Sequence, residues 1–201
     1  MVGSHPPLAT DLTTVPSPRR PLDPGGPGDP VRRWYENDLG WPTVPASAPG
    51  SALRLRTGLR FDVLDMPLEA GRAALRHLAD GSPVAVRGDR MHVLVAAGSA
   101  EELPGLLEWL EWGTLPLDLR ARGAGGCIGA PLFVKAGDRD RAGALQGAAV
   151  WLRPPEPGCE VEASLPTMSA LGGGGGAPDL VRVVDTAATH CHRLRLRSSR
   201  P

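Results

Sequence analysis

Two hydrophobic periodicities alternate along residues 53–152, and this alternation constrains the fold most strongly. A leucine stripe recurs at the i, i+3, i+4, i+7 spacing of a helix face: Leu103, Leu106, Leu107 and Leu110. Segment 53–56 instead alternates apolar and polar residues, as a half-buried strand does. By such patterns, strands are also expected at 61–65, 84–87, 91–96, 115–119, 127–134 and 148–152. Helices are expected at 67–81 and 99–112, the second capped by Ser99 with Glu102 in a capping box. The expected fold class is therefore α/β (α+β), a mixed β-sheet with packed helices.

The distribution of proline and glycine divides the chain into four parts. Residues 1–30 are rich in both and poor in large apolar side chains, which predicts a disordered tail. Residues 31–153 form the expected domain. Residues 154–178 contain a run of glycines and are interpreted as a flexible linker. Residues 179–201 are expected to form a helix capped by Asp179, docked back on the domain, with a basic end.

Composition restricts the expected cellular location and the expected classes of binding partner. The chain has no long apolar run and does not begin like a signal peptide, so we expect a cytoplasmic protein with no membrane partner. Its formal net charge of +0 argues against electrostatic attraction between the whole protein surface and nucleic acid. A local basic patch is still compatible with this charge. Lys135 is the only lysine. The excess of arginine over lysine fits phosphate binding, because arginine binds phosphate through two parallel hydrogen bonds. A GC-rich genome with actinobacterial-like codon usage would produce the same excess.

Several common site motifs are missing. The sequence contains no P-loop, no G-x-G-x-x-G and no G-x-S-x-G segment. The three cysteines are far apart and include no C-x-x-C pair, so neither a disulfide framework nor a thiolate zinc site is expected. His190-Cys191-His192 diverge around a helix, so they are poorly placed to share one metal ion, and Cys191 is expected in the core.

Four motif-bearing segments occur in a fixed order. They are Trp41-Pro42-Thr43-Val44-Pro45, then 57–65 (TGLRFDVLD), then 87–95 (RGDRMHVLV), then Leu117-Asp118-Leu119-Arg120 followed by 125–131 (GGCIGAP). This order resembles the N-terminal domain of bifunctional DNA primase/polymerases, a branch of the archaeo-eukaryotic primase superfamily. The resemblance covers roughly residues 31–155, and segment 146–151 resembles the closing strand of that domain.

The resemblance implies nucleotidyl transfer at a pair of magnesium or manganese ions, which carboxylates on neighbouring strands hold. Carried over by position, Asp65 and Asp118 are the candidate metal ligands and catalytic carboxylates. His92 is the candidate catalytic histidine that contacts nucleotide phosphates. Arg87 and Arg120 are further candidates for nucleotide binding.

The sequence departs from this pattern in two places. Pro67 stands where a second carboxylate is expected, and proline cannot bind a metal. Strand alternation sends Asp62 to the face opposite Asp65, and Glu69 would have to reach in from the next helix. In the hairpin, Asp89 and Arg90 replace glycines that would allow close approach to phosphate.

Each candidate also has a structural interpretation, which remains open here. Asp65 can cap the helix that follows it, His92 can be a hydrogen-bonded strand residue, and Asp118 can end a strand at a turn.

Three functions fit these observations. The first is a primase/polymerase-like domain with lost or weakened nucleotidyl transfer and a binding or regulatory role, whose partner is single-stranded nucleic acid, a nucleotide or a protein. The second is an active magnesium- or manganese-dependent primase or polymerase. The third is a small protein–protein interaction module that exposes helix 100–112, the proline-rich tail and the basic C-terminal helix. Enzymatic activity is left open, and an inactive site needs no metal cofactor.

Overall fold

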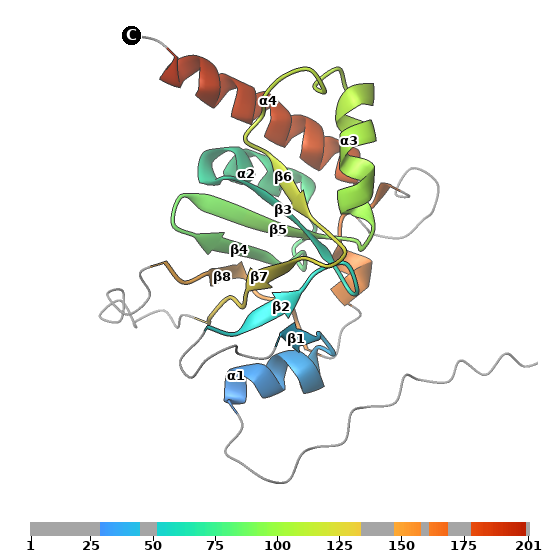
Figure 1. The fold of residues 1–201 in the computed structure, drawn as a ribbon, viewed down its shortest axis with the longest axis vertical. Helices are drawn as coiled ribbons and strands as arrows, with labels where there is room; N and C mark the ends of the chain where they lie inside the picture. Colours follow the sequence, from blue (N-terminus) through green and yellow to red (C-terminus); the bar gives the residue numbers. More distant parts are fainter. Residues whose placement is uncertain (1–28, 45–51, 134–146, 158–160, 169–177, 200–201) are drawn as a thin grey trace, which may run out of the picture.

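A computed structural model describes residues 29–44, 52–133, 147–157, 161–168 and 178–199 (Figure 1). The strands are β1 (Thr43–Val44), β2 (Arg54–Arg56), β3 (Asp62–Pro67), β4 (Val84–Arg87), β5 (Arg90–Val95), β6 (Arg120–Arg122), β7 (Cys127–Gly129) and β8 (Val150–Arg153). The α-helices are α1 (Pro30–Arg33), α2 (Leu68–Ala74), α3 (Ser99–Trp109) and α4 (Leu180–Ser198). A π-helix (Trp34–Asp38) continues α1, a 3-10 turn (Leu75–His77) continues α2, and another 3-10 turn spans Val161–Ser164.

The strands form two sheets, with orders β6-β3-β5-β4-β8 and β1-β2-β7. All pairings between these strands are antiparallel, and parallel pairing occurs as isolated bridges in the described residues. The α+β class is thereby confirmed. In the described part of the chain, no helix is both long and apolar enough to cross a membrane.

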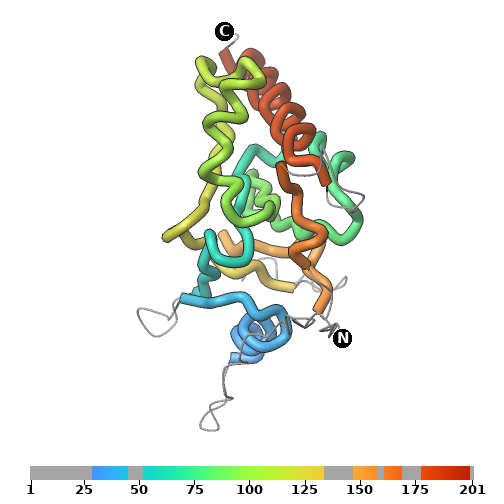
Figure 2. Tube along the Cα trace, turned by 90° about the vertical axis from the view of Figure 1, so that its right-hand side faces the viewer, coloured from blue at the N-terminus to red at the C-terminus, as the bar shows by residue number. Residues whose placement is uncertain are grey.

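Helices α2, α3 and α4 cover one face of the five-stranded sheet (Figure 2). Leu64 and Met66 of β3 point to this side, where they meet the buried face of α4. That face consists of Leu180, Val183, Val184, Ala187, Ala188 and Cys191, as expected from their spacing. Asp179 caps α4, because its carboxylate accepts a hydrogen bond from the Val181 N–H at 2.9 Å. The predicted docking of the C-terminal helix is confirmed.

The opposite face of the five-stranded sheet packs against aromatic side chains from the N-terminal elements. Val63 and Leu94 of the sheet lie in one buried cluster with Tyr35, Trp41 and Phe61. The Tyr35 hydroxyl donates to the carbonyl oxygen of Pro131 at 2.6 Å and accepts from Trp151 Nε1 at 2.9 Å. Burial raises the pKa of Tyr35, so the hydroxyl stays protonated.

Part of the predicted flexible linker is packed onto the domain. Val161 and Leu165 are buried in the aromatic cluster, and the Ala96 N–H donates to the Pro166 carbonyl. The linker interpretation of 154–178 therefore does not hold for 161–168, because two apolar side chains there find a hydrophobic surface to cover. The glycine run 172–176 and residues 1–28 of the predicted tail lie outside the described residues.

Two local predictions are wrong. Residues 115–119 form a turn rather than a strand, and the strand begins at Arg120. Pro116 has no N–H to donate to a ladder, and Leu117 packs against the helix-side core. Ser99 does not cap α3. Gly98 is the capping residue with φ of 94°, and the Asp62 carboxylate accepts from the Ala100 N–H at 2.9 Å.

Replacing Gly71 with alanine is expected to lower the free energy of unfolding by about 1–3 kcal/mol through overpacking. An added Cβ would lie 2.3 Å from Sδ and 2.7 Å from Cβ of Met91, because α2 lies close on β5. Gly105→Ala in α3 is the control, since nothing lies within 4 Å of its added Cβ and alanine favours helix there. Urea denaturation measures the free energy of unfolding of both variants, and a Gly71→Ala protein as stable as Gly105→Ala would contradict this packing.

Candidate functional site

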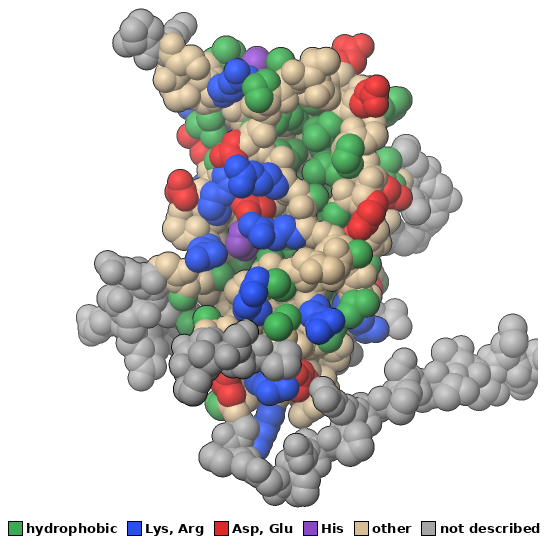
Figure 3. Space-filling view, in the orientation of Figure 1, with side chains coloured by type: hydrophobic (Ala, Val, Ile, Leu, Met, Phe, Trp, Pro, Cys, Tyr) green, Lys and Arg blue, Asp and Glu red, His purple; other side chains and the backbone are tan. Residues whose placement is uncertain are grey.

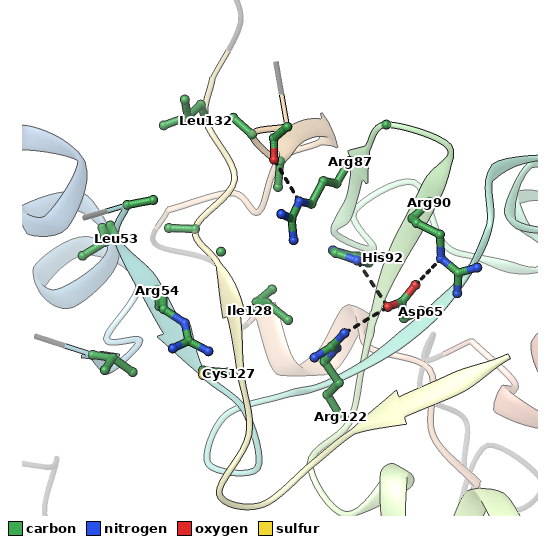
Figure 4. Close-up of a pocket in the computed structure, with 18 of the residues that line it drawn as sticks. Leu53, Arg54, Asp65, Arg87, Arg90, His92, Arg122, Cys127, Ile128 and Leu132 are labelled. Carbon is green, nitrogen blue, oxygen red and sulfur yellow. Dashed lines mark hydrogen bonds and ion pairs between the residues drawn. The ribbon is translucent and has the colours of Figure 1, made fainter. Parts of the chain in front are cut away.

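An open cleft of about 1380 Å³ lies between the two sheets. Pockets for small ligands typically measure roughly 300–1,000 Å³, so this cleft has room for an extended ligand. Leu53 and Ile128 line the wall on the side of the small sheet, and Leu132, whose backbone bridges to Val150 of β8, lines the cleft with them (Figure 4). The facing wall of the large sheet is charged, so the cleft combines an aliphatic side with a polar side.

Asp65 lies at the centre of the charged wall, on the same face of β3 as Val63. It is 6% exposed. Arg90 Nε donates to Asp65 Oδ1 at 2.7 Å, and Arg122 Nη2 donates to Oδ2 at 3.3 Å. Burial alone would raise the pKa of Asp65, but Arg90, His92 and Arg122 outweigh it, and the pKa lies below its ordinary value. Asp65 is therefore a fully ionised carboxylate at neutral pH.

Arg90 joins the two predicted metal-binding carboxylates. Besides its bond to Asp65, its Nη1 donates to Asp118 Oδ2 at 2.5 Å. Asp118 lies just before β6 and is half exposed, at 52% of its side chain. Burial would lower the pKa of Arg90, but the two carboxylates raise it, so the guanidinium keeps its charge. One guanidinium thus occupies the space between Asp65 and Asp118.

His92 lies directly opposite Asp65 in the β3–β5 register. Its Nε2 is 3.8 Å from Asp65 Oδ2, and its side chain is 7% exposed. Burial lowers the pKa of His92, Asp65 opposes this, and the neighbouring arginines lower it further. The imidazole is therefore neutral at pH 7. Its Nδ1 is buried and has no hydrogen-bond partner in the described residues.

Arginines surround this centre. Arg54, Arg87 and Arg120 line the cleft with Arg90 and Arg122. Figure 3 shows blue side chains gathered around an acidic and a histidine side chain near the middle of this face. The Arg87 Nε donates to the Gly147 carbonyl at 2.8 Å, which holds that side chain at the rim. The neutral net charge of the chain therefore coexists with a local concentration of arginine.

All the predicted site residues line this one cleft: Asp65, Arg87, His92, Asp118 and Arg120. The two proposed substitutes for the missing carboxylate do not. Glu69 forms an ion pair with Arg197 of α4, and Asp62 faces the start of α3. Asp65 does not cap α2, whose capping residue is Pro67 without a side-chain bond.

No motif in the sequence indicates a role in the site for Arg54, Arg90 or Arg122. The alternation of side chains along a strand indicates the face on which two of these arginines lie. Arg90 is two residues from His92 on one strand, and Arg122 is two residues from Arg120 on another, so each pair shares a face. What alternation does not specify is that both guanidinium groups reach the same carboxylate.

The residues present do not fit a two-metal centre. Arg90 and Arg122 bind both oxygens of Asp65, and Arg90 binds Asp118. Within the described ranges, no three His, Cys, Asp or Glu side chains gather closely enough to hold a metal ion. Magnesium or manganese binding by Asp65 and Asp118 stays a prediction.

Comparisons with protein-family models, curated proteins and solved structures give no match. The resemblance to primase/polymerase domains therefore rests on the motif order alone.

Proposed function

We propose that this chain is a primase/polymerase-like binding protein whose cleft holds the phosphates of a nucleotide or of single-stranded nucleic acid, without efficient nucleotidyl transfer. The observation that carries the proposal is the arginine lining of the cleft around His92, with Arg54 from the small sheet and Arg87, Arg90, Arg120 and Arg122 from the large sheet. Guanidinium groups bind phosphate through paired hydrogen bonds as well as charge.

The shape of the cleft supports a ligand with an apolar part. Leu53, Ile128 and Leu132 line the same cleft as the arginines, so a sugar or base can contact aliphatic side chains while its phosphate meets the charged ones. The cleft is open and larger than a typical small-molecule pocket, which suits a nucleotide or a short stretch of single strand.

The contacts of the two carboxylates support weak or absent catalysis. A two-metal mechanism needs carboxylate oxygens that are free to bind cations. Here Arg90 engages both Asp65 and Asp118, and Pro67 offers no third carboxylate.

Binding is tested with a fluorescently labelled single-stranded oligonucleotide and with a labelled nucleotide. The double variant Arg54→Ala, Arg120→Ala is expected to bind about ten-fold more weakly at low salt, with a shallower salt dependence, because two phosphate contacts are lost. Arg72→Ala, Arg182→Ala is the matched control, since both arginines are exposed on helices outside the cleft. Equal weakening by both double variants would show that binding does not occur in the cleft.

Catalysis is tested by manganese-dependent nucleotide incorporation on primed and unprimed single-stranded templates. The expected result is no incorporation above background by folded protein. Incorporation that Asp65→Ala, Asp118→Ala abolishes would establish an active primase or polymerase instead.

A second candidate function is protein–protein interaction at the end of the molecule formed by α3 and α4, with a second copy as the partner. Trp109 is 71% exposed and Leu196 is 55% exposed, whereas Trp112 donates to Asp185 at 3.0 Å. Exposed glutamates line α3 and exposed arginines end α4, so a two-fold pairing would match opposite charges: Glu101, Glu102, Glu108 and Glu111 with Arg193, Arg195 and Arg197.

Analytical ultracentrifugation tests this self-association. Concentration-dependent dimers are expected, and Trp109→Ala is expected to abolish them because an exposed aromatic anchor is lost. A monomer at all concentrations would reject this second function.

A further inference from the structure

The antiparallel register explains how Arg90 comes to lie between the carboxylates. Pro67 and Arg90 are direct partners across β3 and β5, as are Asp65 and His92. Directly opposed side chains share a face of the sheet. The position that lacks a carboxylate is therefore paired with the position that supplies a cation.

The contacts of Arg90 are those of an internal cation. It binds Asp65 at 2.7 Å and Asp118 at 2.5 Å through different nitrogens, and its side chain is 23% exposed. A guanidinium has more N–H donors than these two bonds use, so further donors remain for a ligand in the cleft. A divalent cation placed between the same carboxylates would meet this charge and that of Arg122 at close range.

We propose that the Arg90 guanidinium takes the place of a divalent cation in this cleft. The cleft then binds phosphate groups in metal-free form, and it excludes divalent cations while Arg90 is in position. The ligand part of this inference rests on the proposed phosphate-binding function, and the cation part does not.

The ligand is accordingly a polyphosphate or phosphodiester that carries no bound magnesium. Arg90 is anchored by Asp65, so it presents its free donors from a fixed place, and Arg87 and Arg120 lie on the same wall. Magnesium reduces the negative charge of a polyphosphate, which weakens its attraction to these arginines. Phosphate binding should therefore persist in chelator and decline when magnesium is added.

The first experiment uses the unmodified full chain and inorganic tripolyphosphate, with binding measured by isothermal titration calorimetry. Affinity in EDTA is expected to be at least about ten-fold higher than in saturating magnesium. A ten-fold change in affinity corresponds to the loss of about one charge-assisted hydrogen bond. A requirement for magnesium would overturn the proposal. This comparison needs no variant, so it does not depend on the folding of an Arg90 mutant.

The second experiment measures manganese binding by electron paramagnetic resonance without any phosphate. The unmodified protein is expected to bind no manganese at millimolar concentration. Arg90→Gln is expected to gain a site that Asp118→Asn then removes, and Arg90→Lys is expected to gain none because its charge remains. Arg72→Gln on α2 is the control for loss of an arginine outside the cleft.

The outcomes separate this inference from the proposed function. Failure of the unmodified protein to bind both tripolyphosphate and oligonucleotide would reject the proposed function and the ligand part of the inference. The manganese titration still decides the cation part: a gain in Arg90→Gln supports it, and manganese binding by the unmodified protein overturns it. A folded Arg90→Gln that binds no manganese overturns it equally.

Discussion

Asp65→Asn is expected to lower the free energy of unfolding at pH 7 by about 2–4 kcal/mol, because it breaks a largely buried ion pair from one side. The change keeps the size of the side chain and removes its charge. Arg90 at 2.7 Å and Arg122 at 3.3 Å then lose their anionic partner, because the amide keeps one acceptor oxygen but carries no charge. Urea denaturation followed by circular dichroism measures the effect.

Asp118→Asn is the matched control. It removes the other carboxylate that Arg90 binds, but the Asp118 side chain is 52% exposed against 8% for Asp65. An exposed ion pair contributes only about 0–1 kcal/mol, so this variant should be nearly as stable as the unmodified protein. Equal destabilisation by the two variants would contradict the assignment of Asp65 as the buried anchor of Arg90.

The cost of Asp65→Asn is also expected to depend on pH. The pKa of Asp65 is lowered in the folded state, so its contribution is fully present above the unfolded value of about 3.9 and is lost as pH falls through the folded pKa. The pKa of Asp62 is raised, chiefly by burial, so protonation of Asp62 in acid favours the folded state, whereas protonation of Asp65 disfavours it. The difference between Asp65→Asn and the unmodified protein cancels the Asp62 contribution. Asp65 also raises the pKa of His92, so the titration of His92 adds to this difference below about pH 6.5. The difference should shrink below about pH 4, where Asp65 itself takes up a proton.

Tyr35→Phe is expected to lower the free energy of unfolding by about 2–4 kcal/mol, since it leaves two buried groups without a partner. The lost hydroxyl binds the Pro131 carbonyl and the Trp151 indole N–H, which lie far from Tyr35 in the sequence. The hydroxyl therefore ties the N-terminal helical segment to β8 and to the segment after β7. Because burial raises the pKa of Tyr35, the effect should be the same at pH 6 and pH 8.

Ser198→Ala is the control for Tyr35→Phe. Its hydroxyl donates to the Arg195 carbonyl at 2.9 Å but is exposed, so water replaces the lost bond. The expected change in melting temperature is small for this variant and several degrees for Tyr35→Phe. A Tyr35→Phe protein as stable as Ser198→Ala would show that the buried hydroxyl is not needed to satisfy its neighbours.

Elements whose signals are local were predictable from the sequence. The leucine stripe of α3, the capping aspartate of α4 and the short turn between β4 and β5 each depend on residues within a few positions of one another. The candidate residues Asp65, His92 and Asp118 were likewise placed by motif order, and they do line one cleft. Alternation along β3 also separated Asp62 from Asp65 correctly, as their contacts show.

The interaction partners of these residues depend on tertiary packing, which local patterns do not encode. The Asp62 carboxylate of β3, rather than Ser99, accepts from the N-terminal turn of α3, and residues 161–168 pack where a linker was expected, because in each case a distant surface offered a better contact than the local sequence. The placement of Arg90 is the clearest case. It depends on the β3–β5 register and on the turn before β6, which bring Asp65 and Asp118 within reach of one guanidinium from residues 25 and 28 positions away. Side-chain pairing over such separations follows from how strands are aligned in space, and periodicity along the chain does not encode that alignment.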